Sequence, residues 1–150
     1  MNLIGQEGIT IDALWSDGPV AHLGVGLPGF PNFFMLMGPH SPVGNYSLTA
    51  IAEHQCEHIL RWVRRWQDNQ IDAVAPSAAA TAAFNAEMRA AMPGTVWATG
   101  CTSWYLGKDG VPELWPWTPD AYRHRLAAEP NPSDYDLVTP DARLVEHLRR

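Results

Sequence analysis

The first third of the chain is rich in glycine and proline, and this feature limits the fold more than any other. Its apolar runs, Ile9–Ile11 and Phe33–Met37, are short and are bounded by turn residues. Glycine favours tight turns, and proline interrupts helices. The sequence therefore predicts strands and loops from Met1 to Tyr46, with helices only after that point.

The segment from Ser47 to Trp66 has the periodicity of an amphipathic helix. Its apolar residues recur at steps of three or four, at Leu48, Ala52, Cys56, Ile59, Val63 and Trp66. Ser47 can cap the first turn, and three arginines near the end suit the negative end of the helix dipole. We expect one long helix here, with this stripe as its apolar face.

The rest of the chain alternates helix and loop signals. Alanine favours a helix before Pro93-Gly94, and Thr118-Pro119 is a typical helix start. The predicted elements are a helix over Ser77–Ala91, an extended segment over Thr95–Leu106, a helix over Asp120–Ala128, a turn over Asn131–Asp134 and a helix over Asp141–Arg150.

Composition excludes several classes of protein. The chain is 46% hydrophobic and 17% charged, which is typical of a globular domain rather than a disordered one. Its net charge is −6, which disfavours nucleic-acid binding. The longest apolar run, Phe33–Met37, is far shorter than the ~20 residues of a membrane span. With two cysteines and no apolar leader, we expect a cytoplasmic protein.

Two short motifs suggest chemistry that their surroundings do not support. Gly24–Gly29 matches G-x-G-x-x-G, but prolines follow where a nucleotide-binding helix would have to begin. His54 and His58 match H-x-x-E-H, yet the helical spacing places them on the polar side with Arg61 and Arg65, whose charges oppose a metal ion. We therefore predict a glycine-rich loop and no metal site.

Neither cysteine is a predicted nucleophile. Cys101 has no base that the sequence assigns to it, and Cys56 lies on the apolar stripe, where a small buried side chain is the expected role. The sequence indicates no catalytic residue.

The segment Phe33–Ser47 predicts a strand, a constrained loop and a helix start in succession. Free backbone N–H groups and the positive end of the helix dipole would meet at such a place. This arrangement suits an anion or an electron-rich carbonyl, but it is equally compatible with a stiff connector.

Three blocks in this order resemble the C-terminal part of class B flavoprotein monooxygenases. They are GLPGFPNFFMLMGPHSPVGNYS, the helix with Glu53 and Gln55, and GCTSWYLGKDG, and the likeness runs from about Gly5 to Leu137. The family includes Baeyer–Villiger and flavin-containing monooxygenases, and the Ser103-Trp104-Tyr105 block favours the Baeyer–Villiger branch.

The resemblance implies an α/β fold. Residues 1–70 would be the C-terminal part of a doubly wound, Rossmann-like FAD-binding domain, and residues 71–150 a helical, loop-rich extension with an NADP-contacting loop. It implies FAD and NADPH as cofactors and oxygenation of ketones, or of sulfur or nitrogen, through a flavin peroxide. The partners would be dioxygen and a small-molecule substrate.

The resemblance also implies the site residues. Leu48 matches the flavin-contacting position, with Gly38, Pro39 and Ser47 as neighbours, and Trp104 matches a tryptophan that donates a hydrogen bond to NADP⁺. The alternative for Trp104 is an aromatic anchor that packs beneath the loop.

The nucleotide-binding glycine motifs and the active-site arginine of the family are expected upstream of Met1. We therefore expect a fragment that holds FAD and NADPH only together with those N-terminal domains, and that is inactive alone. The alternative is a noncatalytic fragment that binds another protein through the surface those domains would cover.

Overall fold

The computed structural model describes residues 3–42, 46–100 and 103–140, and these residues form a mixed α/β structure with few strands. The α-helices are α1 (Ile11–Leu14), α2 (Leu48–Gln67), α3 (Ala78–Ala91) and α4 (Pro119–Ala127), and the strands are β1 (Ala73–Pro76) and β2 (Tyr135–Val138). Short 3₁₀ turns occupy Gln6–Gly8, Met92–Gly94, Val96–Ala98 and Pro132–Asp134. None of the helices within these ranges combines the length and apolar content needed to cross a bilayer.

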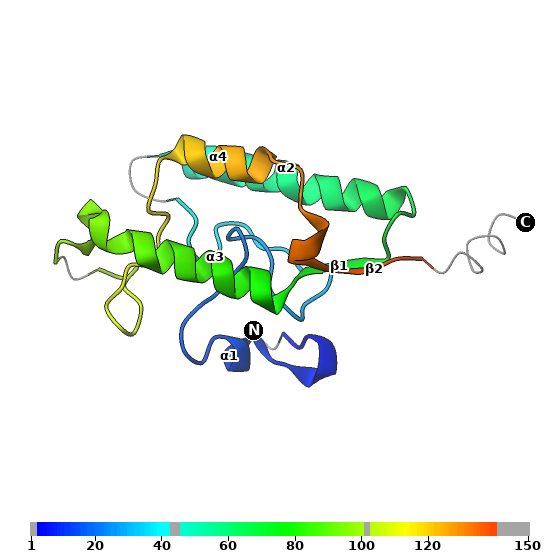
Figure 1. The fold of residues 1–150 in the computed structure, drawn as a ribbon, viewed down its shortest axis with the longest axis horizontal. Coiled ribbons are helices and arrows are strands. Elements are labelled where there is room, and N and C mark those ends of the chain that lie inside the picture. Colours follow the sequence, from blue (N-terminus) through cyan, green and yellow to red (C-terminus); the bar gives the residue numbers. More distant parts are fainter. Residues whose placement is uncertain (1–2, 43–45, 101–102, 141–150) are drawn as a thin grey trace, which may run out of the picture.

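The three longer helices organise the molecule (Figure 1). α2 and α4 lie side by side along one edge, and α3 runs along the middle of the view. The segment that contains α1 lies on the other side of α3, and the β1–β2 ribbon extends from one end of the helices.

The predicted starts of the three longer helices are confirmed. The hydroxyls of Ser47, Ser77 and Thr118 accept hydrogen bonds from the backbone N–H groups of Ala50, Ala80 and Ala121, respectively. Each bond satisfies one of the amides that a helix leaves unpaired at its N-terminus. Local side-chain chemistry therefore fixes where these helices begin.

β1 and β2 form a two-stranded antiparallel sheet in which Ala73 pairs with Val138 and Pro76 pairs with Tyr135. β1 leads into α3 through Ser77, whose N–H donates to the carbonyl of Asp134 at 2.9 Å. The pairing joins segments about sixty residues apart, and the sequence analysis did not predict either strand.

Among the described residues, the buried side chains form three clusters. The largest lies between the helices and contains Val25, Ile51, Phe84, Met88, Trp115, Tyr122 and Leu126. A second cluster, under the N-terminal segment, contains Ala21, Leu27 and Phe30. The third joins α2 to the sheet and contains Trp62, Ile71 and Val74.

The buried face of α2 differs from the predicted one. The structure buries Ile51, Gln55, His58 and Trp62, and it leaves Cys56 exposed, together with Leu48 and Trp66 at 55% and 57% exposure. The prediction that Cys56 is buried and that His58 lies on the polar side is therefore wrong. Polar residues can face this core because they find hydrogen-bond partners there.

Two predicted extended regions are also wrong in detail. Phe33–Met37 has one bridge, from Phe34 to Gly26, because Asn32 and Met37 on either side adopt positive φ angles of 57° and 58°. Over Thr95–Leu106, the hydroxyls of Thr95 and Thr99 donate to the carbonyls three residues before them and close tight turns. Thr10 caps α1 where Ile9–Ile11 suggested a strand.

Some predictions lie outside the described residues. They concern Cys101, the centre of the loop at residues 43–45, and the helix over Asp141–Arg150.

Candidate functional site

The loop before α2 is built on a close approach of two backbone segments. The N–H of Gly38 donates to the carbonyl oxygen of Gly24 at 3.1 Å. A Cβ at position 38 would lie 2.5 Å from that oxygen, so only glycine fits. Met37 and His40, on either side, both have φ near +60°. Non-glycine residues rarely keep this conformation unless the surrounding structure holds them in it.

Gln55 of α2 supplies much of that support. It is fully buried, and its side-chain oxygen accepts a hydrogen bond from the N–H of Met37 at 2.8 Å. Its amide nitrogen donates to the hydroxyls of Ser41 and Tyr122, at 2.9 and 2.7 Å. The Tyr122 hydroxyl in turn donates to the carbonyl of Leu23 at 2.7 Å. One amide side chain thus joins the loop, α2 and α4.

The buried environment keeps this network in one protonation state. Burial raises the pKa of Tyr122 to about 12, so its hydroxyl remains a donor at neutral pH. Neutral donors and acceptors that are fully paired can remain in a core without the cost of a buried charge.

A second segment, Tyr105–Leu114, forms the other wall. The N–H of His40 donates to the carbonyl of Glu113 at 3.2 Å, and the N–H of Glu113 donates to the carbonyl of Tyr105 at 2.9 Å. His40 Nδ1 lies 3.3 Å from the carbonyl oxygen of Leu114 and must carry the proton, because a carbonyl only accepts. Burial lowers the pKa of His40, so the ring is neutral.

A half-open cavity of about 350 Å³ lies between these two segments, and three predicted site residues line it. Gly38, Pro39 and Trp104 all line it, although Trp104 is more than sixty residues from the other two along the chain. Most of the lining is apolar, and among the described lining residues the one carboxylate is that of Glu113, whose pKa burial raises. The remaining lining residues are Trp15, Pro19, Met35, Leu36, Met37, Ser41, Tyr105 and Leu114.

Trp104 is 86% exposed, so in this chain it is not an anchor packed beneath its loop. Its ring meets the edge of the neighbouring Tyr105, with the ring centroids 5.8 Å apart. The indole is therefore available to a molecule that enters the cavity.

The other two predicted residues lie apart from this cavity. Ser47 and Leu48 form the start of α2, both are exposed, and neither lines the cavity. The first turn of α2 contains no acidic side chain that would offset the positive end of its dipole. Gln55, His40 and Tyr122, which the sequence analysis did not select, hold the site together. Gln55 and His40 stand in blocks that carry the resemblance, but no local pattern predicts their hydrogen bonds, because the partners lie far away in the sequence.

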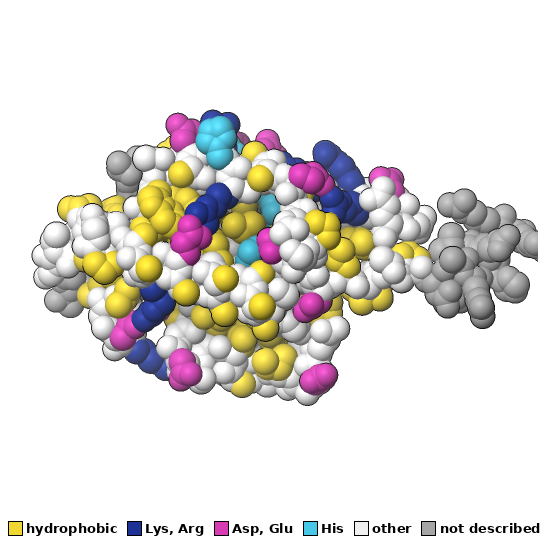
Figure 2. Space-filling view, in the orientation of Figure 1, with side chains coloured by type: hydrophobic (Ala, Val, Ile, Leu, Met, Phe, Trp, Pro, Cys, Tyr) yellow, Lys and Arg dark blue, Asp and Glu magenta, His cyan; other side chains and the backbone are white. Residues whose placement is uncertain are grey.

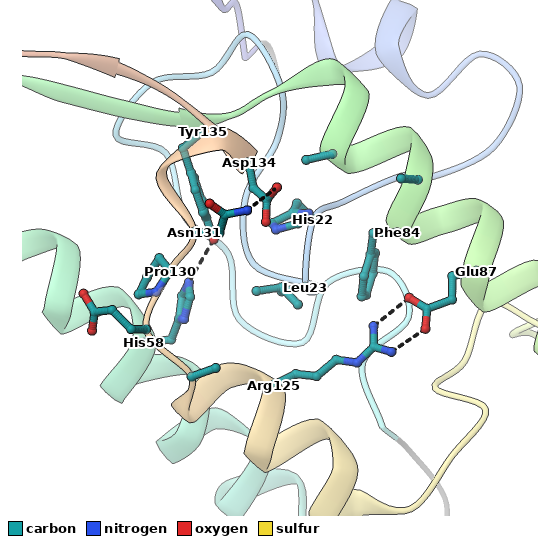
Figure 3. Close-up of a pocket in the computed structure, with 14 residues that line it drawn as sticks. His22, Leu23, His58, Phe84, Glu87, Arg125, Pro130, Asn131, Asp134 and Tyr135 are labelled. Atoms are coloured by element: carbon teal, nitrogen blue, oxygen red, sulfur yellow. Dashed lines mark hydrogen bonds and ion pairs between the residues drawn. The ribbon is translucent and has the colours of Figure 1, made fainter.

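A second cavity, of about 380 Å³, lies between α2, α3, α4 and the segment before β2 (Figure 3). Beside this cavity, Arg125 forms a bidentate ion pair with Glu87. Figure 2 shows the cavity as a hollow between α3 and α4, with histidine side chains at its floor. None of the predicted site residues lines it.

His58 reaches this cavity as a neutral ring. Its Nδ1 lies 3.2 Å from the carbonyl of Leu126, and its Nε2 faces the hydroxyl of Tyr135 at 3.5 Å. Burial lowers its pKa to about 4. Within the described residues, no three His, Cys, Asp or Glu side chains are grouped so as to hold a metal ion.

Known proteins resemble the chain over nearly all of its length. An uncharacterized monooxygenase of Mycobacterium tuberculosis strain H37Rv is 58% identical over 137 residues, which are 91% of this chain and 28% of that protein. An FAD-binding monooxygenase of Emericella nidulans is 29% identical over 97% of the chain, and a Baeyer–Villiger monooxygenase of Streptomyces coelicolor is 33% identical over 92%.

Solved structures match the chain over a similar extent. The cyclohexanone monooxygenase of Rhodococcus sp. Phi1, bound to NADP⁺, superposes on 93% of the chain with a TM-score of 0.82 and 27% identity, and the match covers 27% of that enzyme. The chain is a partial homologue of the FAD-binding Baeyer–Villiger monooxygenases.

The chain spans about a quarter of the length of the Baeyer–Villiger monooxygenases and other relatives that it matches. No protein-family model matches it.

Proposed function

We propose that this chain is the segment of an FAD- and NADPH-dependent Baeyer–Villiger monooxygenase that presents the α2 start to the flavin and Trp104 to the nicotinamide cofactor. The observation that carries this proposal is the cavity that Gly38, Pro39 and Trp104 share, from two distant segments. The assignment of Ser47 and Leu48, which lie outside that cavity, to the flavin rests on the sequence resemblance. The homologous enzymes bind FAD and NADP⁺, which supports the same cofactors here.

The residues at the start of α2 fit an electron-rich ring. The first turn is exposed and lacks carboxylates, so its backbone N–H groups and positive dipole end favour a partner that gains negative charge. Leu48 would contact the ring, with Ser47, Gly38 and Pro39 beside it. Bound FAD would supply the activation of dioxygen for oxygenation of a ketone, or of a sulfide or amine.

Trp104 fits a cofactor contact because it offers one donor and a large exposed face. The indole N–H can only donate, which suits the ribose oxygens of NADPH. Its aromatic face can cover a bound cofactor while the apolar cavity wall excludes water. Gln55 and Tyr122 act as positioning residues, since they hold the Met37–Ser41 loop in its left-handed conformation.

A hybrid enzyme tests this proposal. The matching 137 residues of the Mycobacterium tuberculosis monooxygenase are replaced by those of this chain, which is 58% identical there. Parent and hybrid are compared for bound FAD and for NADPH oxidation with a panel of ketones, sulfides and amines. We expect the hybrid to hold FAD and to oxidise the parent's substrates. A hybrid that holds FAD but fails with every substrate the parent accepts would show that the proposal is wrong.

A further inference from the structure

The second cavity, between α2, α3, α4 and the segment before β2, has the size and lining of a ligand site (Figure 3). Its volume of about 380 Å³ falls within the ~300–1,000 Å³ of small-molecule sites. Part of the lining is apolar and includes Leu23, Ala80, Ala83 and Phe84, whereas the rest carries imidazole, carboxylate, amide and phenol groups. An apolar wall with a few convergent polar groups is typical of sites for small organic molecules.

The polar end of this cavity presents acceptors. Nδ1 of His58 carries its proton toward the carbonyl of Leu126, so Nε2 can only accept, and the Tyr135 hydroxyl that faces it at 3.5 Å directs its hydrogen there. The oxygen lone pairs of Tyr135 are thereby left for a ligand. Burial raises the pKa of Tyr135 and lowers that of His58 to about 4, so both groups are neutral at neutral pH. Nδ1 of His22 is buried without a hydrogen-bond partner among the described residues, so the chain's own groups do not complete this end.

The charges of the lining leave one carboxylate uncompensated. Arg125 pairs with Glu87, and Glu129 pairs with Arg65, which lies outside the lining. Asp134 takes part in no ion pair of the described residues, and its carboxylate accepts only a long hydrogen bond, of 3.4 Å, from the side chain three residues before it. The cavity is therefore negatively charged at neutral pH, and a cation would offset that charge.

Asp134 lies where the polar and aromatic parts of the lining meet. In Figure 3 its carboxylate lies beside the His22 ring, whose pKa burial lowers and the charge of Asp134 partly raises again. The His22 ring meets the rings of Phe84 and Tyr135 edge to face, with the centroids 5.7 and 5.4 Å away. Aromatic rings attract cations through their electron-rich faces, so the surroundings of this carboxylate favour the same kind of ligand.

We propose that this cavity binds a small organic cation, namely a protonated primary amine on a compact apolar body. The ammonium group donates to the Asp134 carboxylate and to the lone pairs of the Tyr135 hydroxyl, and the apolar body packs on the Phe84 wall. The inference goes beyond the proposed function and does not depend on it, because no described residue lines both this cavity and that of Trp104.

Other classes of ligand fit this lining less well. An anion would meet the Asp134 carboxylate, and Arg125, the one Lys or Arg among the described lining residues, is already paired with Glu87. A metal ion would need three or more grouped ligands, which the described residues do not provide. A quaternary ammonium ion has no N–H group to donate to the acceptors.

Three probes of similar size test the charge preference. At neutral pH, phenethylamine is a cation, phenethyl alcohol is neutral and phenylacetate is an anion. Each is titrated into the 150-residue chain and into the hybrid enzyme, and the Kd is measured by NMR from the shifts of the histidine ring protons. In both proteins we expect the amine to bind at least about tenfold more tightly than the alcohol, and phenylacetate to bind more weakly than the alcohol. An amine that binds the hybrid no more tightly than the alcohol would overturn the proposal.

Asp134→Asn isolates the role of the carboxylate. The backbone carbonyl of Asp134, and not its side chain, accepts from the N–H of Ser77, so the variant keeps that contact with the start of α3. Amine binding should weaken about tenfold, to within about twofold of the alcohol, and alcohol binding should not change. Asp136→Asn removes the same charge from an exposed position outside the lining, and it should change either Kd by less than about twofold. Equal weakening of amine binding by both variants would contradict the proposal.

Ala83→Phe tests the location of the site. Ala83 lines the cavity from α3, and a phenyl ring there would take the space of the ligand's apolar body. Binding of the amine should fall at least about tenfold. Ala82→Phe is the matched control, since Ala82 is exposed and is not a lining residue, and its Kd should stay within about twofold of that of the unmodified protein. Full amine binding by Ala83→Phe would place the site elsewhere and overturn the proposal.

Zinc chloride covers the alternative occupant. We expect no stoichiometric zinc on either protein, and zinc that the amine displaces and that His58→Gln abolishes would overturn the proposal in favour of a metal site. None of these readouts needs flavin or oxygenation. An inactive hybrid that prefers the amine contradicts only the proposed function, and an active hybrid without that preference contradicts only this inference.

Discussion

Trp62 and Trp104 show how one residue type serves two different purposes in this chain. Trp62 is 1% exposed, packs on Tyr135 with the ring centroids 4.6 Å apart, and lies under the guanidinium of Arg65. Trp104 is 86% exposed and meets the edge of the Tyr105 ring. Burial of an indole stabilises a fold, whereas an exposed indole contributes little until a ligand covers it.

Replacement of Trp104 should therefore affect cofactor binding and leave stability unchanged. In the hybrid enzyme, we expect Trp104→Phe to weaken NADPH binding by about 0.5–1.5 kcal/mol, the value of one hydrogen bond. Trp104→Ala should weaken it further, because the aromatic area is lost as well, and should release more hydrogen peroxide per NADPH oxidised. NADPH titration and peroxide assays measure these effects.

The Tm of both Trp104 variants provides the control. It should match that of the unmodified hybrid, since the side chain is largely exposed. If Trp104→Ala lowers the Tm by several degrees while NADPH binding stays the same, the tryptophan is a packing residue and the cofactor assignment is wrong.

The buried His58 makes stability depend on pH. Its folded pKa is about 4 and its unfolded pKa is 6.5, so the unfolded chain takes up its proton first as the pH falls. The stability is present above about pH 6.5 and is lost progressively towards pH 4, by about 3 kcal/mol in total. His58→Gln cannot titrate, and we expect it to flatten the fall. Urea unfolding at several pH values measures the slope.

His54→Gln is the matched control for that measurement, because His54 lies one turn away on α2 and is partly exposed. The control should keep the slope of the unmodified chain, to which the half-buried His22 and the buried His40 also contribute, because burial lowers the pKa of both. An unchanged slope in His58→Gln would contradict the assignment.

Among the elements, α2 shows what sequence patterns predict well and what they predict poorly. Its bounds follow from the Ser47 cap and the apolar periodicity, and both signals are local. Its buried face was predicted wrongly, because periodicity counts apolar residues and cannot tell which partner they meet. Gln55 and His58 face the core because their hydrogen-bond partners, the Tyr122 hydroxyl and the Leu126 carbonyl, lie there on α4.

Gln55→Leu should destabilise the fold more than its size change suggests. The substitution leaves the Met37 N–H and the Ser41 and Tyr122 hydroxyls without their buried partner. We expect a loss of about 2–4 kcal/mol in the free energy of unfolding, as measured by chemical denaturation. Gln67→Leu, at the exposed end of the same helix, should cost less than about 0.5 kcal/mol. Similar losses for both variants would show that the buried network is not needed.

At the scale of the whole molecule, the sequence did not predict contacts between residues far apart in the chain, such as the pairing of β1 with β2. β1 and β2 are four residues each and pair across about sixty residues of chain, and Trp62 of α2 packs in one cluster with Val74 of β1 and Tyr135 and Leu137 of β2. The walls of the candidate site likewise come from segments that lie far apart in the sequence. The sequence resemblance identified Gly38, Pro39 and Trp104 as site residues without indicating that they meet, and the fold brings them to one cavity. The residues that hold those walls carry no local signal.

The 150-residue chain should not retain FAD by itself. The adenosine and pyrophosphate of a dinucleotide need a glycine turn that opens a helix. Gly24–Gly29 is the chain's match to that motif, and it is a loop with no helix in it. Flavin absorbance per protein after gel filtration should be close to zero for the chain and stoichiometric for the hybrid. Stoichiometric flavin on the purified chain would contradict this expectation.

The pairing of β1 with β2 also governs when the chain can finish folding as it leaves the ribosome. Trp62, Ile71 and Val74 emerge early, but Tyr135 and Leu137, which pack on them, are synthesised more than sixty residues later. Helices with local contacts can form during that interval, whereas a distant strand pair must wait for its second member. This part of the core therefore closes after residue 138 has been added, and until then Trp62 and Val74 remain accessible to chaperones.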